Sequence, residues 1–411
     1  MSGTSGPSQR PPRRRPPPRR YPPAVYWRRR LAVVLGAALV VAVIVGIVSL
    51  FGGSPGNSGK ATKTAPSHPT TTATTAPVPA SGIGLRTVTW TDTNTSAGGV
   101  VNPAPGGSAR PRTLVTEIWY PSIGGSRTRP TVREKPDYGG GPYPVVVFAH
   151  GFDTLPATYT PLLASWVNAG FVVVAPFFPD ENADEINSLG NATPLQLETA
   201  ESDVVNEPYD IAYVVGEVES GATGAASSGA PWLKGLVQEG KYALAGHSDG
   251  AQAVAALVYA QAPHQEYATT YGDLATPPFA VVILSGSELS GTYSPPASPP
   301  PLLFVQSALD ACNLPQQAAT LLHDVGGGFF LKLLEASHFS AYVGRGRAAP
   351  IVEKVTVAFL KAARSGQPRL SELSPFLSPA HVAALYPLST PPVLTALQPT
   401  TAEIAQSCAA P

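Results

Sequence analysis

The sequence predicts an α/β fold, with a mainly parallel central sheet flanked by helices and preceded by one transmembrane helix. Between about residues 85 and 365, short apolar runs alternate with helix-like stretches, which is typical of βαβ units. Several of the runs are continuous Val, Ile, Leu and Phe, as expected for strands that are buried on both faces. Residues 31–51 are apolar and uncharged, and they have the length of roughly 20 residues that a helix needs to cross a bilayer.

The N-terminal part predicts a membrane anchor. Residues 1–30 contain nine arginines and no acidic residue, and we expect a disordered cytoplasmic tail there. A secretory signal peptide is the alternative for 31–51, but its apolar region usually spans about 7–15 residues, so we favour a retained single-pass helix. The positive-inside rule then places the following chain outside the cytoplasm. Residues 52–82 are rich in Thr, Pro and Ala and predict an extended linker.

The charge distribution argues against a nucleic-acid partner. The formal net charge is 0, but the chain after residue 30 carries 18 basic and 27 acidic residues. Nucleic-acid binding would call for a basic face, and this acidic body offers none. The expected partners are therefore the membrane, through residues 31–51, and a substrate.

The globular domain is expected over residues 83–370, followed by a Pro-rich C-terminal extension at 371–411. A helix-like fragment in that extension, "PAHVAALYP", has no assigned role. The apolar runs predict strands at 113–121, 143–151, 171–179, 242–248, 279–287, 301–310 and 329–338. The intervening stretches predict helices at 157–169, 203–219, 250–261, 315–324 and 349–364.

Residues 246–250, Gly-His-Ser-Asp-Gly, predict a nucleophile elbow centred on Ser248. An apolar strand precedes this segment and an Ala-rich helix follows it, which is the context that such an elbow requires. The motif alone is weak, because a chain this rich in Gly and Ser should contain GxSxG by chance about 0.3 times. The context therefore carries the prediction that Ser248 is a nucleophile.

A serine nucleophile needs a base, and the base needs an acid that orients it. Asp310 and His338 follow Ser248 in the order serine, acid, histidine, and each closes a predicted strand. Open α/β sheets place their ligand chemistry at the carboxyl ends of strands, which favours both residues. The competing side chains lie at predicted helix ends, in a loop or in the C-terminal extension: His264, His323, His381, Asp273 and Asp324.

An oxyanion hole would need two backbone donors that are fixed before the reaction. The N–H of Asp249, directly after the nucleophile, is one candidate. The N–H of Phe152, in the loop that follows an early predicted strand, is the other. Gly151 would let that backbone approach closely, and we expect the His150 imidazole merely to pin the loop.

Together these segments resemble a known group of enzymes. "RPRTLVTEIWYPS", "YPVVVFAHGF", "GHSDG", "LLFVQSALD" and "EASHFSAY" are similar to the platelet-activating-factor acetylhydrolase and polyester-hydrolase (cutinase-like) branch of the α/β hydrolases, with dienelactone hydrolases nearby. The resemblance implies the α/β-hydrolase fold and roles for Ser248, Asp310 and His338 as the triad, with Phe152 and Asp249 as oxyanion donors. Departures at Ala251 and Asp249, an acid-rich stretch at 180–202 and the lack of a Trp-anchored groove leave the substrate open.

The predicted function is a membrane-anchored, extracytoplasmic serine hydrolase that cleaves a small-molecule, lipid or polymer ester through an acyl-enzyme. We expect no cofactor and no metal. An acyltransferase or amidase acting on envelope lipids, and an inactive surface binding protein with the same fold, are the alternatives. Cys312 and Cys408, the two cysteines, could form one disulfide outside the cytoplasm or be unrelated thiols.

Overall fold

The computed structural model describes residues 82–93, 111–261, 274–289, 292–377 and 382–387. They all belong to the larger of two compact units, Lys63–Pro411, and the other unit, Met1–Thr62, lies outside the described residues. The predicted cytoplasmic tail and the transmembrane helix at 31–51 therefore fall outside as well. Among the described helices, none combines the length and the apolar character that a bilayer crossing needs.

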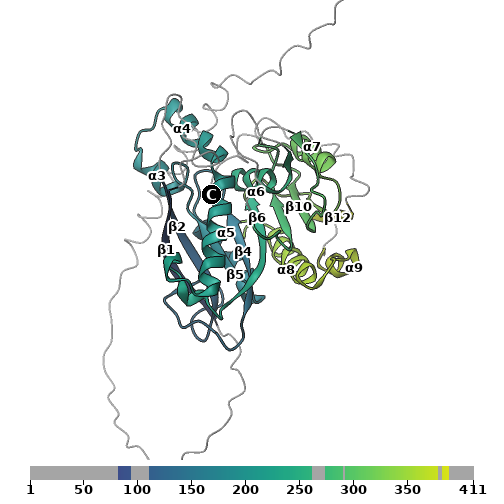
Figure 1. Ribbon diagram of the computed structural model, residues 1–411. Coiled ribbons are helices and arrows are strands. Elements are labelled where there is room, and N and C mark those ends of the chain that lie inside the picture. Colours follow the sequence, from purple (N-terminus) through teal and green to yellow (C-terminus); the bar gives the residue numbers. More distant parts are fainter. Residues whose placement is uncertain (1–81, 94–110, 262–273, 290–291, 378–381, 388–411) are drawn as a thin grey trace, which may run out of the picture. The chain divides into compact units, whose positions relative to one another are not determined.

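A single ten-stranded sheet runs through the described domain (Figure 1). Its order is β12-β11-β10-β8-β6-β4-β5-β2-β1-β3. The strands are β1 (Gly82–Asp92), β2 (Arg112–Ser122), β3 (Thr131–Val132), β4 (Tyr143–Ala149), β5 (Val172–Pro176), β6 (Val237–His247), β8 (Val281–Leu284), β10 (Leu302–Ser307), β11 (Phe329–Leu333) and β12 (Ala383–Pro387). Two further strands, β7 (Ala260–Gln261) and β9 (Thr292–Tyr293), form a separate antiparallel pair.

The prediction of a mainly parallel sheet is confirmed at the centre of the sheet but not at its edges. The neighbouring strands from β5 to β11 pair in parallel. By contrast, β2 pairs antiparallel with β5 and β1, and β12 pairs antiparallel with β11. The sheet is therefore mixed. All seven predicted runs overlap a strand, and most of these strands are shorter than the run because the run also includes residues of the turn that follows, such as Ser285, Gly286 and Ser287 after β8.

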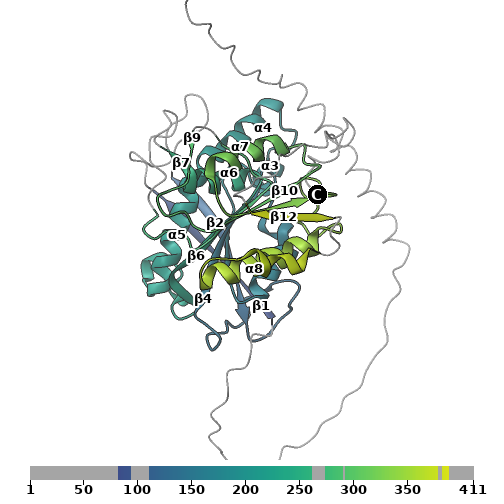
Figure 2. The ribbon, with the colours of Figure 1, turned by 90° about the vertical axis from the view of Figure 1, so that its right-hand side faces the viewer.

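Helices cover both faces of the sheet (Figure 2). Residues of α5 (Glu207–Thr223), α6 (Asp249–Tyr259) and α7 (Pro315–Val325) pack on one face, and residues of α2 (Thr160–Asn168) and α8 (Ala349–Ser365) pack on the other. Each of the five predicted helices overlaps one of these. Two short helices at the rim, α3 (Ala183–Ser188) and α4 (Pro194–Glu201), were not predicted, and neither was α9 (Leu370–Leu373).

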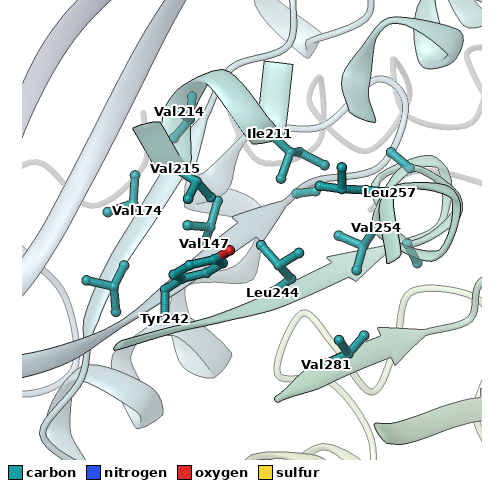
Figure 3. Packing of buried hydrophobic residues seen from close by; sticks show 14 of the residues in the cluster. Val147, Val174, Ile211, Val214, Val215, Tyr242, Leu244, Val254, Leu257 and Val281 are labelled. Carbon is teal, nitrogen blue, oxygen red and sulfur yellow. The ribbon is translucent and has the colours of Figure 1, made fainter. Parts of the chain in front are cut away.

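The alternation of side chains along the strands divides the core into two layers. Val145 and Val147 of β4 belong to the cluster under α5 and α6, whereas Val146 and Phe148 belong to the cluster under α2 and α8. This is the two-residue period of a strand, applied to a run that is apolar on both faces. Figure 3 shows the first cluster, where Val147 and Leu244 of neighbouring strands meet the helical residues. Burying each such side chain stabilises the fold by roughly 1.5–3 kcal/mol.

The prediction of a helix-like fragment in the C-terminal extension is wrong, because Ala383–Pro387 form strand β12. The segment pairs with Phe329–Leu333 of β11 and therefore covers what would otherwise be an open edge of the sheet. Val382 and Ala383 are buried in the α8-side cluster. Ala-rich sequence favours a helix, but this tertiary contact overrides the local preference.

Candidate active site

Ser248 occupies a strained turn between β6 and α6. Its φ and ψ are 56° and −120°, which is outside the regions that a residue with a side chain normally adopts. The turn depends on its glycines: a Cβ on Gly246 would lie 2.3 Å from the carbonyl oxygen of Gly250, and a Cβ on Gly250 would lie 2.4 Å from that of Ala149. The segment thus adopts the strand–turn–helix geometry that the sequence predicts for a nucleophile elbow.

The side chains of Ser248, His338 and Asp310 form a continuous hydrogen-bond chain. Ser248 Oγ lies 2.9 Å from His338 Nε2, and His338 Nδ1 lies 2.9 Å from each carboxylate oxygen of Asp310. Asp310 follows β10 and His338 follows β11, so both lie beyond the carboxyl ends of parallel strands, as Ser248 does. The three side chains are buried, with only Ser248 retaining 8 % exposure. The structure therefore brings together the three residues chosen from chain order.

The carboxylate of Asp310 is held by donors that the sequence did not reveal. Its Oδ1 accepts the backbone N–H groups of Cys312 and Asn313, each at 3.0 Å, and its Oδ2 accepts from Gln306 Nε2 at 3.3 Å. These donors hold the carboxylate in place beside His338. An ionised Asp310 accepts from His338 Nδ1–H, which leaves the lone pair of Nε2 facing the Ser248 hydroxyl.

The loop after β4 lies directly against Ser248. A Cβ on Gly151 would come within 2.8 Å of the Ser248 Cβ, so only glycine fits there. His150 pins this loop as predicted: its Nδ1 donates to the carbonyl oxygen of Gly151 at 2.9 Å, and its Nε2 accepts from the Phe178 N–H at 3.1 Å. Burial lowers the pKa of His150 to about 4, so its imidazole is neutral near pH 7. The use of the Phe152 and Asp249 N–H groups as oxyanion donors stays a prediction.

The acid-rich segment at 180–202 contacts the same loop. The Glu181 carbonyl oxygen accepts the Asp153 N–H at 2.9 Å, and the Phe152 side chain packs against Ile186 of α3 and Ala200 of α4. The elements that follow β5 are thus attached to the backbone around Phe152.

Two completely buried glutamates, Glu181 and Glu207, lie near this loop and were not predicted from the sequence. Burial, and then the charge of Glu207, raise the pKa of Glu181 well above its ordinary value. Burial likewise raises the pKa of Glu207, to which the charge of Asp249 adds. No sequence pattern marks the pair, because 26 residues separate them and the fold alone brings them together.

Of the competing side chains, His323 and Asp324 lie in the described part of the chain, and they pair with each other rather than with the cluster. On α7, His323 Nδ1 lies 2.7 Å from Asp324 Oδ1, and the His323 side chain is 86 % exposed. This is the surface position that a helix-end histidine suggests. His264, His381 and Asp273 lie outside the described residues.

One group in the described part of the chain has ligand atoms close enough to hold a metal ion: Asp310, Cys312 and His338, whose atoms lie within 4.8 Å of one another. Cys312 is disulfide-bonded, so its sulfur is not the thiolate that metals prefer. The expected partner, Cys408, lies outside the described residues. The donor set therefore suits the hydrogen-bond chain better than a metal site.

Two of the comparisons with known proteins found a similarity. The family model for chlorophyllase matches residues 117–199, from within β2 to within α4. A solved structure, the ferulic acid esterase from Streptomyces cinnamoneus, is similar with 17 % identity and a TM-score of 0.47, covering 75 % of this chain and 98 % of that one. No curated protein matches the sequence.

The mixed sheet with flanking helices, the strained serine turn between β6 and α6 and the matched family define the chain as an α/β hydrolase. The resemblance found in the sequence is thereby confirmed at the level of this superfamily.

Proposed function

We propose that the chain hydrolyses carboxylic esters with Ser248 as nucleophile, His338 as general base and Asp310 as the acid that orients the base. The observation that carries this proposal is the unbroken hydrogen-bond chain from Ser248 Oγ through both ring nitrogens of His338 to a carboxylate that accepts three further donors. This arrangement meets the geometric requirement for an activated serine.

The mechanism follows from the direction of these hydrogen bonds. His338 Nε2 takes the Ser248 proton while Oγ attacks the ester carbonyl, and the N–H groups of Phe152 and Asp249 stabilise the oxyanion. The protonated His338 then gives its proton to the departing alcohol, which leaves the acyl group on Ser248. Water, deprotonated by His338, releases the acid and restores the serine. Asp310 stays ionised and holds the Nδ1 proton throughout.

Steady-state hydrolysis of p-nitrophenyl esters of increasing chain length tests the assignment. Ser248→Ala and His338→Gln should lower kcat by about 10⁴-fold or more, and Asp310→Asn should cause a loss of similar order because it favours the wrong tautomer. His323→Gln is the matched control, because that histidine is exposed and pairs with Asp324 instead of with the site. Unchanged kcat in any of the three site variants would show that the wrong residue was chosen.

We further propose that the catalytic domain lies outside the cytoplasm, anchored by residues 31–51. The nine arginines before this uncharged apolar segment support the orientation, and the disulfide-bonded state of Cys312 fits an oxidising compartment. Since the chain has two cysteines, we propose Cys408 as the partner. Peptide mapping without reduction should recover the two cysteines in one cross-linked product.

Fractionation tests the anchor. The full-length chain should stay with the membrane in alkaline carbonate, whereas a chain lacking residues 31–51 should be released. Recovery of the full-length chain in the soluble fraction, or its cleavage after the apolar segment, would contradict the proposal.

A further inference from the structure

A second hydrogen-bond chain lies behind the proposed triad and joins three distant segments. Gly151, in the loop after β4, donates its N–H to the Tyr159 hydroxyl at 3.3 Å. Tyr159, at the end of the turn Pro156–Tyr159, contacts His247 Nδ1 at 2.9 Å. His247, the last residue of β6, has its Nε2 2.9 Å from the carbonyl oxygen of His338. Tyr159, His247 and His338 are all buried.

The protons in this second chain have one consistent arrangement. A carbonyl oxygen only accepts, so the Nε2 of His247 must carry a hydrogen. Burial, and then the charge of His338, lower the pKa of His247 well below its ordinary value, so that the ring is neutral and Nδ1 accepts. Burial raises the pKa of Tyr159, which keeps its proton and donates it to Nδ1. The chain therefore runs in one direction, from the Gly151 N–H to the His338 carbonyl.

The ring of His247 is fixed by its neighbours. Its centroid lies 4.7 Å from those of His338 and Tyr342 and 5.1 Å from that of Phe339. A buried histidine with two hydrogen bonds is, by itself, an ordinary satisfied core residue. Here, however, the hydrogen-bond chain through His247 ends on two functional loops. One end is the backbone of Gly151, beside the expected oxyanion donor, and the other is the backbone of His338, the expected base.

We propose that His247 and Tyr159 are positioning residues, which fix the distance between the loop of Gly151 and the loop of His338 across the nucleophile. This inference rests on the proposed ester hydrolysis. Neither residue touches substrate. Both act through the backbone of groups that would do so. Misplacement by about 1 Å can cost about 10²-fold in rate, so the effect belongs in kcat.

Three variants of the full-length chain test the proposal: Tyr159→Phe, His247→Phe and the double variant. Tyr159→Phe removes one hydroxyl and should lower kcat about 10- to 100-fold with KM within about threefold of wild type. His247→Phe should lower kcat at least as much. Because both residues act through one chain, the double variant should be no slower than the slower single variant. His247→Gln, which retains a donor and an acceptor, should recover part of the loss.

Tyr342→Phe is the matched control. The Tyr342 ring packs on the His247 ring, but its buried hydroxyl has other partners: Ser285, Ser307 and the carbonyl oxygen of Val305. The variant should lower the melting temperature about as much as Tyr159→Phe and leave kcat within about twofold of wild type.

Two outcomes are distinguishable. An inactive wild type overturns the proposed function and this inference with it. An active wild type, combined with wild-type kcat in folded Tyr159→Phe and His247→Phe, or with multiplicative losses in the double variant, overturns this inference alone.

Discussion

At the scale of single residues, Ser248 shows how strain is tolerated at a reactive position. A residue in so sparsely populated a backbone conformation costs of order 1–3 kcal/mol, which the surrounding structure must offset. Here Gly246 and Gly250 allow close packing of the turn, and the Ser248 N–H donates to the Leu284 carbonyl of β8 at 3.1 Å. The backbone N–H of Ser248 is therefore satisfied in the strained turn, and the turn aims the hydroxyl at His338.

Much of this residue-level picture follows from the sequence, and the exceptions share one cause. Ser248, Asp310 and His338 were predicted from their order in the chain and their positions at strand ends, and the structure brings them within hydrogen-bond distance. Tyr159 and His247 could not be selected, because 88 residues separate them and only the fold brings them together. The same holds for donors to Asp310 such as Gln306 Nε2.

The buried pair of Glu181 and Glu207 predicts a specific pH dependence of stability. The pKa of each carboxyl is raised in the folded state, so each stabilises the fold fully below its unfolded pKa, about 4.3 for a glutamate, and loses that contribution as pH rises through the folded value. Glu207→Gln cannot ionise. It should therefore raise the free energy of unfolding at pH 8 by about 1–3 kcal/mol and change it much less at pH 5.

Urea unfolding at both pH values measures this effect. Glu198→Gln, on the exposed side of α4, is the control and should shift stability equally little at either pH. A Glu207→Gln variant that is less stable than wild type at pH 8 would mean that Glu207 is ionised and paired in the fold.

At the scale of secondary-structure elements, the edges of the sheet were harder to predict than its centre. Central strands such as β4 are continuous apolar runs because helices cover both of their faces. β1, next to the two-residue edge strand β3, is only partly buried and mixes Thr and Arg with apolar residues, so it lacks that pattern. β12 is five residues of mostly Ala and Leu, which favour a helix until the edge of β11 supplies a partner.

Arg112 joins three elements on the α5 side of the sheet. From β2, its guanidinium donates to Asp203 in the turn Ser202–Val205 at 2.5 and 2.9 Å and to Asp210 in α5 at 2.8 Å, and all three side chains are buried. Burial opposes the charge of Arg112, but the two carboxylates outweigh it and raise the pKa. Burial also raises the pKa of Asp210 to about 6, even beside Arg112.

Removal of this cation should be costly. Arg112→Met leaves two buried carboxylates without their counter-charge and should destabilise the fold by about 3–5 kcal/mol in urea unfolding at pH 7. Arg127→Met, at an exposed arginine, should stay within about 0.5 kcal/mol of wild type. An Arg112→Met variant as stable as that control would show that the cluster is not held by this ion pair.

At the scale of the whole molecule, the charge around the proposed site is one-sided. No lysine or arginine occurs in residues 136–233 or 242–331, the stretches that carry Phe152, Ser248 and Asp310. The acidic character that argued against a nucleic-acid partner is therefore concentrated on the segments that carry Phe152, Ser248 and Asp310. Such a field should repel anionic substrates, and salt should screen the repulsion.

Two p-nitrophenyl esters of equal length test this charge selectivity. At low ionic strength, kcat/KM for the glutarate half-ester, which carries a free carboxylate, should be at least about 10-fold below that for the neutral valerate ester. The gap should narrow as salt rises towards about 1 M, where the Debye length falls to about 3 Å. Equal values at low salt, or a preference for the anionic ester, would contradict the prediction.

The central claim is that Ser248 is the nucleophile. Its most direct test is mass-spectrometric mapping of the adduct that a fluorophosphonate forms on the folded full-length chain. We expect one phosphonyl group per chain, on the peptide that contains Ser248, and none on Ser248→Ala. An unlabelled wild type, or an adduct that persists at another residue when Ser248 is replaced, would contradict the account.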